Sequence, residues 1–233
     1  MRKDLTTFKM SISIFTMKPK KFPVSFLKRK VVAKYNILCH IYDAFGLLME
    51  SKARQRAIEI ADIRNGENVL EVAVGTGLNF VEILKRNPYG WNEGLDISPM
   101  MAKKTKKRAE KTGLANYNIK VGDSRNLPYA DGVFDLIINE YMFDIFPARE
   151  YDSFLKEFER ILKPKGRLVL VNTTKGEKWS DSLFNCLFHI YPVNKCRGVL
   201  MNSHLERFHF RDIKREYVVN YTFPSEIVCS RRS

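Results

Sequence analysis

The sequence has few cysteines and no long apolar run. Its four cysteines, in a chain of 233 residues, are widely separated, and neither a C-x-x-C pair nor a histidine pattern accompanies them. This spacing argues against a disulfide framework or a metal site, and it indicates reduced thiols in a cytosol-like compartment. Because no apolar run approaches about 18 residues, we exclude a membrane-spanning helix and expect a soluble protein.

Positive charge is what the sequence has in excess. Hydrophobic residues make up 45% and charged residues 28%, which is ordinary for a globular domain with extensions. Lysine and arginine number 40 against 26 acids, a net charge of +14 that favours anionic partners. Residues 1–34 carry ten basic residues and one acid, or +9 of that total, which leaves +5 for residues 35–233. We therefore predict a basic arm over residues 1–34 and one domain over residues 35–233.

The basic arm allows three interpretations. A secretory signal would need a continuous apolar stretch, which the arm does not contain. A mitochondrial transit peptide would be poor in acids, as the arm is, but rich in arginine, whereas lysine dominates here. Apolar residues alternate with the lysines of residues 18–34, which favours a disordered or membrane-surface arm. The expected location is the cytoplasm, at the membrane surface, or the mitochondrion if the arm is a transit peptide.

Short apolar runs alternate with helical patterns along the rest of the chain. Strands are predicted at residues 69–74, 91–97, 118–121, 133–139 and 167–172. Helices are predicted at residues 78–85, from Ser98 to Gly113, and over residues 151–162, with one or two helices over residues 35–61 that break around Gly46. This alternation predicts an α/β fold with a mostly parallel, doubly wound sheet. Ligands of such sheets bind beyond the carboxyl ends of the strands.

Polar and glycine residues stand at three successive strand ends. Gly75 and Gly77 form a glycine turn that lets backbone N–H groups approach a ligand closely. Phe80 occupies the third small-residue position of a dinucleotide fingerprint, and no phosphate-binding Gly-Lys-Ser/Thr follows, which argues against both of those sites. Asp96 ends the second strand, where an acid accepts hydrogen bonds from ribose hydroxyls. Asp123 follows the third strand, where a carboxylate accepts from an adenine amino group.

Four ordered motifs resemble those of class I S-adenosylmethionine-dependent methyltransferases. They are residues 69–77 (VLEVAVGTG), 94–101 (GLDISPMM), 122–131 (GDSRNLPYAD) and 162–170 (LKPKGRLVL). The resemblance covers residues 35–172 and implies a seven-stranded Rossmann-like sheet with helices on both faces and S-adenosylmethionine as the cofactor. The cofactor-binding residues that it implies are Tyr35, Tyr42, Glu71, Ala73, Gly75, Gly77, Asp96, Ile97, Asp123, Ser124 and Asn139.

The resemblance also implies a role for several of these residues. Glu71 and the backbone of the glycine turn would face the methionine part of the cofactor, and Asp96 would hold the ribose. Asp123 with Ser124 would lie beside the adenine, and Asn139 would border the methyl-transfer site. The family usually has glycine where Ala73 stands, so a methyl group must fit against the cofactor loop.

Two further segments resemble a subgroup of this class. Residues 35–43 (YNILCHIYD) are similar to the opening helix of ubiquinone/menaquinone C-methyltransferases and of bacterial phospholipid N-methyltransferases, in which tyrosines cover the cofactor. For Tyr42 the alternative is an amphipathic packing helix. Residues 223–228 (FPSEIV) resemble the last edge strand of these enzymes.

The implied reaction displaces a methyl group from a sulfonium, for which positioning is the main requirement. We therefore assign no catalytic residue. Glu140, Tyr141 and Asp144 follow the fourth strand and are candidates for binding or deprotonating a substrate, with polar surface around a turn as the alternative. An apolar insert near residues 176–200 is expected to cap the site, which suits a lipophilic acceptor, with plain packing as the alternative. The lysine-rich helix over residues 99–112 is either a solvated face or an anionic-membrane contact.

These observations order the candidate acceptors. A phospholipid amine comes first and a quinone-ring carbon second, both small or lipid substrates reached with membrane contact through the basic arm. The positive net charge also allows an RNA methyltransferase, and a scaffold that binds the cofactor without catalysis is the alternative to an enzyme. Residues 87–89 (NPY) resemble the box of adenine-methylating enzymes but stand before the second strand instead of after the fourth, so they carry no such assignment.

Overall fold

The computed structural model describes residues 32–33, 35–36, 42–174, 177, 198–221 and 223–233. The predictions for the basic arm, over residues 1–34, and for the cap near residues 176–200 fall almost wholly outside these residues. Within the described chain, no helix is long and apolar enough to cross a membrane, and no three His, Cys, Asp or Glu side chains gather as a metal site would require.

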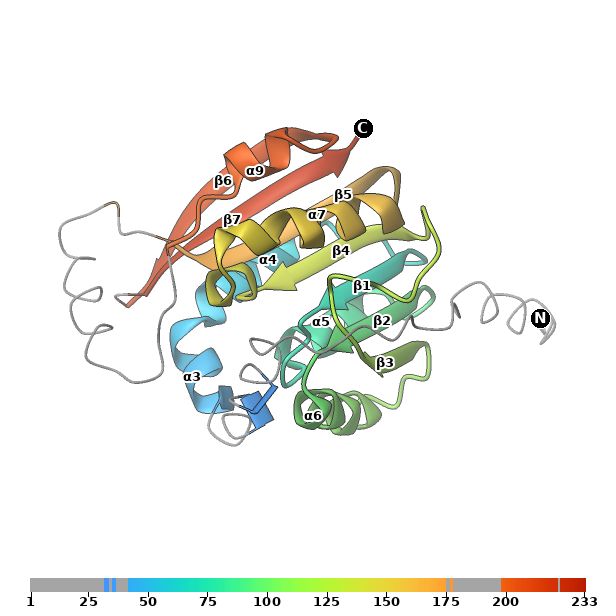
Figure 1. The fold of residues 1–233 in the computed structure, drawn as a ribbon. Coiled ribbons are helices and arrows are strands. Elements are labelled where there is room, and N and C mark those ends of the chain that lie inside the picture. The colour runs from blue at the N-terminus through green and yellow to red at the C-terminus, as the bar shows by residue number, and fades with distance from the viewer. Residues whose placement is uncertain (1–31, 34, 37–41, 175–176, 178–197, 222) are drawn as a thin grey trace.

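One seven-stranded sheet forms the centre of the described chain, in the order β3-β2-β1-β4-β5-β7-β6 (Figure 1). Its strands are β1 (Asn68–Val72), β2 (Trp91–Asp96), β3 (Tyr117–Val121), β4 (Phe134–Glu140), β5 (Leu162–Thr173), β6 (Phe210–Asn220) and β7 (Phe223–Arg232). The first five pair in parallel, whereas β7 is antiparallel to both β5 and β6. The predicted doubly wound α/β fold is confirmed, and the order reverses direction between β1 and β4.

Helices cover both faces of this sheet. They are α3 (Tyr42–Met49), α4 (Ser51–Ile60), α5 (Leu78–Arg86), α6 (Pro99–Glu110), α7 (Tyr151–Ile161) and α9 (Asn202–Glu206), with 3₁₀ turns η1 (Phe143–Ile145) and η2 (Ala148–Glu150). The helix that starts at Ser98 behaves as its sequence predicts, because the Ser98 side chain accepts a hydrogen bond from the Met101 N–H at 3.2 Å and proline takes the first turn.

The alternation of side chains along each strand divides the core into two layers. Leu136 and Ile138 of β4 pack with α4 and α5, whereas Ile137 between them packs with α7 and α9. The aromatic residues of α7 lie on the second side, where Phe143, Phe154 and Phe158 meet edge to face. The two layers therefore lie on opposite faces of the sheet.

The break that we predicted at Gly46 is wrong. Gly46 lies inside α3, and the helical structure is interrupted at Glu50, between α3 and α4. A side chain at position 46 would come within 3.2 Å of both Arg54 and Glu50, and the Gly46 carbonyl accepts a hydrogen bond from Arg54 at 2.7 Å. The glycine therefore lets the Arg54 guanidinium approach the helix closely. A glycine in a sequence is compatible with either a helix end or such a close contact, and the sequence alone does not distinguish the two.

The predicted last edge strand is also wrong in its position and length. Residues 223–228 belong to β7, which is interior, and the edge is formed by β6, a strand that we did not predict. Its sequence, FRDIKREYVVN, is charged and mostly half-buried, as protected edge strands commonly are, so it lacks the apolar run used to find the other strands. β5 likewise starts at Leu162 instead of residue 167, through a register shift beside β4.

Candidate functional site

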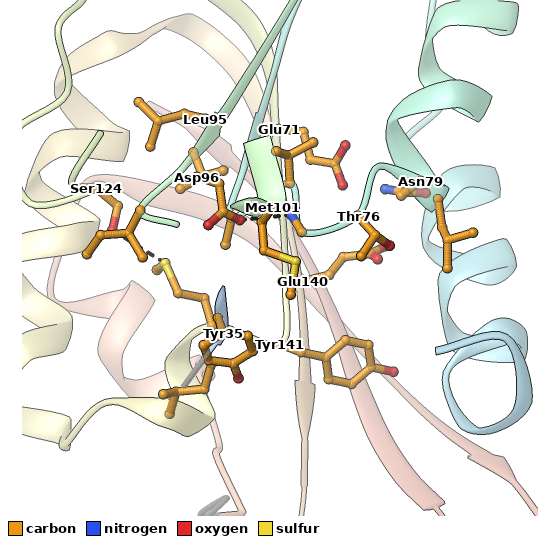
Figure 2. Close-up of a pocket in the computed structure, with 18 of the residues that line it drawn as sticks. Tyr35, Glu71, Thr76, Asn79, Leu95, Asp96, Met101, Ser124, Glu140 and Tyr141 are labelled. Atoms are coloured by element: carbon orange, nitrogen blue, oxygen red, sulfur yellow. Dashed lines mark hydrogen bonds between the residues drawn. The ribbon is translucent and has the colours of Figure 1, made fainter. Parts of the chain in front are cut away.

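A pocket of about 860 Å³, counting the part open to solvent, lies at the carboxyl ends of β1 to β4 (Figure 2). Its walls come from the loop after β1, from the ends of β2 and β3, and from residues 140–146 after β4. Arg54 of α4 also lines the pocket, as does Tyr35 from the segment before α3.

Asp96 joins two of these strand ends. One carboxylate oxygen accepts from the Gly75 N–H at 2.9 Å, and the other accepts from the Ser98 N–H at 2.8 Å. Burial raises the pKa of Asp96 to about 6, although the backbone N–H groups of Ser98 and Gly75 partly oppose the shift. This carboxylate fixes the glycine turn against β2, and it remains an acceptor for a ligand hydroxyl because each oxygen has further lone pairs.

The glycine turn packs directly on α6. Gly77 has a φ of 81°, and a side chain there would come within 2.9 Å of the Thr105 Cα atom. The Thr105 hydroxyl donates to the Gly75 carbonyl at 2.8 Å, which holds the turn in place. Ala73, where the family has glycine, takes a φ of 60° in the left-handed region. Its methyl group fits, but its backbone is strained.

We expect Ala73→Gly to raise the free energy of unfolding by about 0.5–1 kcal/mol. The left-handed conformation costs an L-residue roughly 1–2 kcal/mol, and the added freedom of glycine in the unfolded chain offsets part of that gain. Ala57→Gly in the interior of α4 is the matched control, and it should lower the free energy by about 1 kcal/mol. Urea unfolding of both variants measures the two changes, and a destabilised Ala73→Gly would mean that the methyl contact outweighs the strain.

Three buried glutamates surround a single arginine in the pocket. Arg54 lies 3.5 Å from Glu50 and 3.8 Å from Glu140, while Glu71 stands at the end of β1. Burial and the charge of Glu140 raise the pKa of Glu71 well above its usual value. Burial raises the pKa of Glu140 to about 7, and Arg54 opposes that shift. With one cation against three carboxylates, this part of the pocket suits a positively charged ligand.

One buried polar atom in the same region lacks a partner. Oε1 of Glu140 makes no hydrogen bond within the described chain, and the side chains of Glu71 and Asn79 bond to each other. Figure 2 shows Glu71 and Asn79 side by side at one end of the pocket. Because buried polar atoms are nearly always hydrogen-bonded, this atom indicates where a polar, cationic ligand binds.

Most of the residues proposed from the sequence line this pocket. They are Tyr35, Glu71, Ala73, Gly75, Asp96, Ile97, Ser124, Glu140 and Tyr141. Gly77, Asp123, Asn139 and Asp144 are outside its lining. Tyr42 begins α3, but its side chain lies outside what the structure describes.

The three polar side chains outside the lining have protein partners. Asn139 is fully buried and donates to the Val72 carbonyl at 2.8 Å, so it ties β4 to β1 instead of bordering the pocket. Asp123 is held by Arg125 at 2.8 Å, and its neighbour Ser124 takes the place in the wall. Asp144 accepts from the Thr173 hydroxyl at 2.7 Å.

Sequence reasoning missed polar residues from α4, from the junction before it and from α5. Arg54 and Glu50 precede the first motif, and no local pattern marks them as part of the site. Asn79 stands in the first turn of α5, directly after the glycine turn, and the structure leaves it only 3% exposed. The apolar wall formed by Met142, Ile145 and Phe146 was also missed, since it comes from the irregular chain around η1.

Comparison with known proteins identifies the family. A family described as a methyltransferase domain matches residues 69–166. The chain is 37% identical over 202 residues to a demethylmenaquinone methyltransferase of Thermotoga maritima, covering 85% of this chain and 81% of that protein. The chain belongs to the class I S-adenosylmethionine-dependent methyltransferases. Among them it is close to the quinone C-methyltransferases.

Other matches agree with this assignment. A demethylmenaquinone methyltransferase of Thermus thermophilus is 28% identical over 162 residues, which is 70% of each chain. The crystal structure of a SAM-dependent methyltransferase from Aquifex aeolicus superposes with a TM-score of 0.61 at 19% identity, covering 91% of this chain and 100% of that one. The predictions of a methyltransferase and of S-adenosylmethionine as its cofactor are confirmed, which removes the non-catalytic scaffold.

The pocket of this methyltransferase fits the cofactor by its own chemistry. S-adenosylmethionine carries a sulfonium and an ammonium, and the region of Glu71, Asn79 and Glu140 has an excess of carboxylates over cations. Asp96 offers a buried acceptor at the end of β2, where a ribose is held in such sheets. The residues that would hold the cofactor therefore come from the carboxyl ends of β1 and β2 and from the first turn of α5.

Proposed function

We propose that this methyltransferase methylates a ring carbon of a reduced, lipophilic quinone. The observation that carries the proposal is the buried carboxylate of Glu140, whose Oε1 atom has no hydrogen-bond partner in the pocket that holds the cofactor residues. The name of the Thermotoga maritima relative, a demethylmenaquinone methyltransferase at 37% identity over 85% of this chain, supports the same acceptor.

A quinol that is methylated on carbon needs a proton acceptor in the pocket. Its ring carbon becomes a strong nucleophile once the neighbouring hydroxyl loses its proton. The pKa of Glu140, about 7, lies near the working pH, which is where a general base is most effective. Arg54, 3.8 Å from the other oxygen of Glu140, stabilises the ionised form that accepts the proton.

The rest of the pocket positions the two reactants. When bound, S-adenosylmethionine supplies an activated methyl group on a sulfonium. Glu71, Asn79 and Asp96 hold the polar ends of the cofactor, and Met142, Ile145 and Phe146 form an apolar wall that suits a ring. Two protons move and one is released. The hydroxyl proton passes to Glu140 as the ring carbon takes the methyl group from the sulfonium, which leaves S-adenosylhomocysteine. The methylated carbon then loses its own proton while the ring oxygen regains one, so that the quinol is restored and one proton is released in all.

This order of acceptors reverses the one that the sequence suggested. The phospholipid amine came first there, but the Thermotoga maritima relative is named for a quinone, and the pocket contains a buried carboxylate, Glu140, that can take the hydroxyl proton of a quinol. The phospholipid amine and RNA remain alternatives that the acceptor assay tests.

The assay supplies purified protein with methyl-labelled S-adenosylmethionine and one acceptor at a time. A prenylated 1,4-naphthoquinol that lacks the ring methyl group should take up label, and its oxidised quinone is the matched control that should not, because it has no hydroxyl proton to give. Phosphatidylethanolamine and total RNA complete the set. Label in either of these, with none in the quinol, would replace the proposed acceptor, and equal labelling of quinol and quinone would remove the role of the base.

A further inference from the structure

Exposed apolar side chains gather at one end of the sheet. Seven large apolar residues of the described chain are exposed, and six of them lie at the carboxyl edge of the sheet. These six, which we name the apolar rim, are Leu47, Leu48, Met100, Val121, Leu200 and Tyr221. The seventh, Tyr89, lies in the loop before β2, at the opposite edge, and is 87% exposed.

Two residues of the apolar rim, Val121 and Met100, lie at the ends of β3 and β2. Val121 is the last residue of β3, and Met100 is the second residue of α6, just beyond the end of β2. Both directly adjoin residues of the pocket wall, Gly122 and Met101. The rim on this side therefore borders the mouth of the cofactor pocket.

The other half of the apolar rim lies beyond β5 and β6. Leu200 follows Val199, whose N–H donates to the carbonyl of Thr173 at the end of β5. Tyr221 follows the last residue of β6, Asn220, whose side chain donates at 2.8 Å to the carbonyl of Leu48. That bond brings the exposed end of α3 to this edge, and in Figure 1 α3 lies beyond the arrowhead of β4. Six strand spacings of about 4.8 Å separate β3 from β6, so the rim spans about 29 Å.

Positive charge accompanies the apolar rim. Lys52 at the start of α4 is exposed and donates to the carbonyl of Val219 near the end of β6, so it lies at the same edge. Lys103 and Lys107 are exposed on α6, which starts at the rim. The neighbouring acids are already neutralised, since Asp43 pairs with Arg108 and Asp123 pairs with Arg125, both at 2.8 Å. The edge is therefore apolar and cationic around the pocket.

We propose that the apolar rim docks this methyltransferase on the surface of an anionic lipid bilayer, with the pocket facing the membrane. The inference rests on the proposed function, because docking serves an enzyme whose acceptor lies in the bilayer. A quinone with a long apolar tail stays in the bilayer and must be reached there. Apolar side chains enter the interface, and lysines pair with anionic headgroups, in the manner of interfacial anchors. The basic residues of the arm, over residues 1–34, add to the same attraction.

The test is flotation of the full chain with vesicles that contain no quinone. Vesicles of phosphatidylcholine with about 30% phosphatidylglycerol should bind the protein, and binding to pure phosphatidylcholine should be weaker by about fivefold for each lysine that contacts the surface. The paired change Leu47→Ser with Leu48→Ser should lower the partition at least about tenfold, because each leucine loses most of its apolar transfer. Tyr89→Ser is the matched control and should change the partition less than about twofold.

Three outcomes would overturn the proposal. Equal losses of vesicle partition for the leucine pair and for Tyr89→Ser would mean that the apolar rim is not the contact. Unchanged partition of the leucine pair would mean the same and would assign all binding to the basic arm. Absence of vesicle binding together with salt-dependent RNA binding would assign the cationic edge to nucleic acid. Thermal unfolding and S-adenosylhomocysteine binding of each variant verify the fold, which exposed positions should leave intact.

Failure of docking is distinguishable from failure of the proposed function. Vesicle binding is measured without turnover, so it does not depend on the identity of the acceptor. If the quinol assay succeeds, the leucine pair should keep its rate on a short-chain, water-soluble quinol and lose about tenfold on quinol carried in vesicles. An equal loss on both acceptors would place the leucines in catalysis instead of in docking and overturn the inference.

Discussion

Replacing Glu140 with glutamine should lower the turnover number for quinol methylation by about 10²- to 10⁴-fold, the usual contribution of a general base. Glutamine keeps the shape of the side chain and cannot accept the hydroxyl proton. Binding of S-adenosylhomocysteine, measured by calorimetry, should change by less than about fivefold, because Glu71, Asn79 and Asp96 remain in place. A loss confined to cofactor affinity would show that Glu140 binds the cofactor and does not act as the base.

The stability of the same variant separates a catalytic role from a structural one. Burial raises the pKa of Glu140 to about 7 from 4.5, so the folded state holds the proton more tightly than the unfolded state does. The stability from this group is fully present below about pH 4.5 and is lost as the pH rises through 7, which is about 3 kcal/mol at roughly 1.4 kcal/mol for each pH unit. The protein without cofactor should therefore be more stable as Glu140→Gln at pH 8 and nearly unchanged at pH 5.

The pH profile of the rate and a control variant complete this test. The wild-type rate should rise as the pH passes through about 7, where Glu140 ionises, whereas the residual rate of Glu140→Gln should be flat over that range. Glu93→Gln removes another buried carboxylate, one in β2 that accepts hydrogen bonds from Trp91 and Tyr129 outside the pocket, and it should leave the turnover number within about fivefold. Lower stability of Glu140→Gln at pH 8, with a normal profile, would give Glu140 a structural role only.

The sequence predicts the fold and the site best where one local segment carries the whole signal. Residues 69–77 contain a buried strand, a glycine turn and the start of a helix, and the structure places their backbone in the pocket wall. β1, β4 and most of β5 are apolar runs buried on both faces, which is why periodicity found them. β6 escaped because an edge strand with charged residues has no such run.

The direction of a side chain at a strand end was the harder prediction. Asn139 and Glu140 are consecutive, so they point to opposite faces of β4, and only Glu140 enters the pocket. The alternation of Leu136 and Ile138 toward α4 places Glu140 on the same face, near Arg54, but the sequence does not tell which helix covers that face. Asp123 shows the same limit, since the sequence cannot show that Arg125 occupies its carboxylate.

Strain in the backbone of the site had no sequence signal either. Ala73 and Tyr141 both adopt left-handed conformations, at φ values of 60° and 51°, although neither is glycine. Each follows a parallel strand at the point where the chain turns into the pocket wall, and the Tyr141 N–H is held by the Val171 carbonyl at 2.7 Å. Such conformations persist when surrounding contacts fix them, and they are common at functional sites.

The second large effect is expected at Asp96, where Asp96→Asn should weaken cofactor binding by about 100-fold. The asparagine amide would direct its NH₂ group at the N–H of either Gly75 or Ser98, which leaves a buried donor unsatisfied at a cost of about 1–3 kcal/mol. The variant also loses the charge that accepts strongly from ribose hydroxyls. Calorimetric titration with S-adenosylhomocysteine measures the change, and circular dichroism verifies the fold.

The matched control for this change is Asp123→Asn, which makes the same substitution in a carboxylate that pairs with Arg125 outside the pocket lining. It should weaken cofactor binding by less than about threefold, because an exposed or partly exposed pair contributes little. A loss as large as that of Asp96→Asn would mean that Asp123 leaves Arg125 and holds the adenine, as the family resemblance implies. Titration with the 2′-deoxy analogue of S-adenosylhomocysteine then isolates the ribose contact. The wild-type protein should bind this analogue more weakly than S-adenosylhomocysteine. Asp96→Asn should bind the two with nearly equal affinity, since the acceptor of that hydroxyl is already impaired.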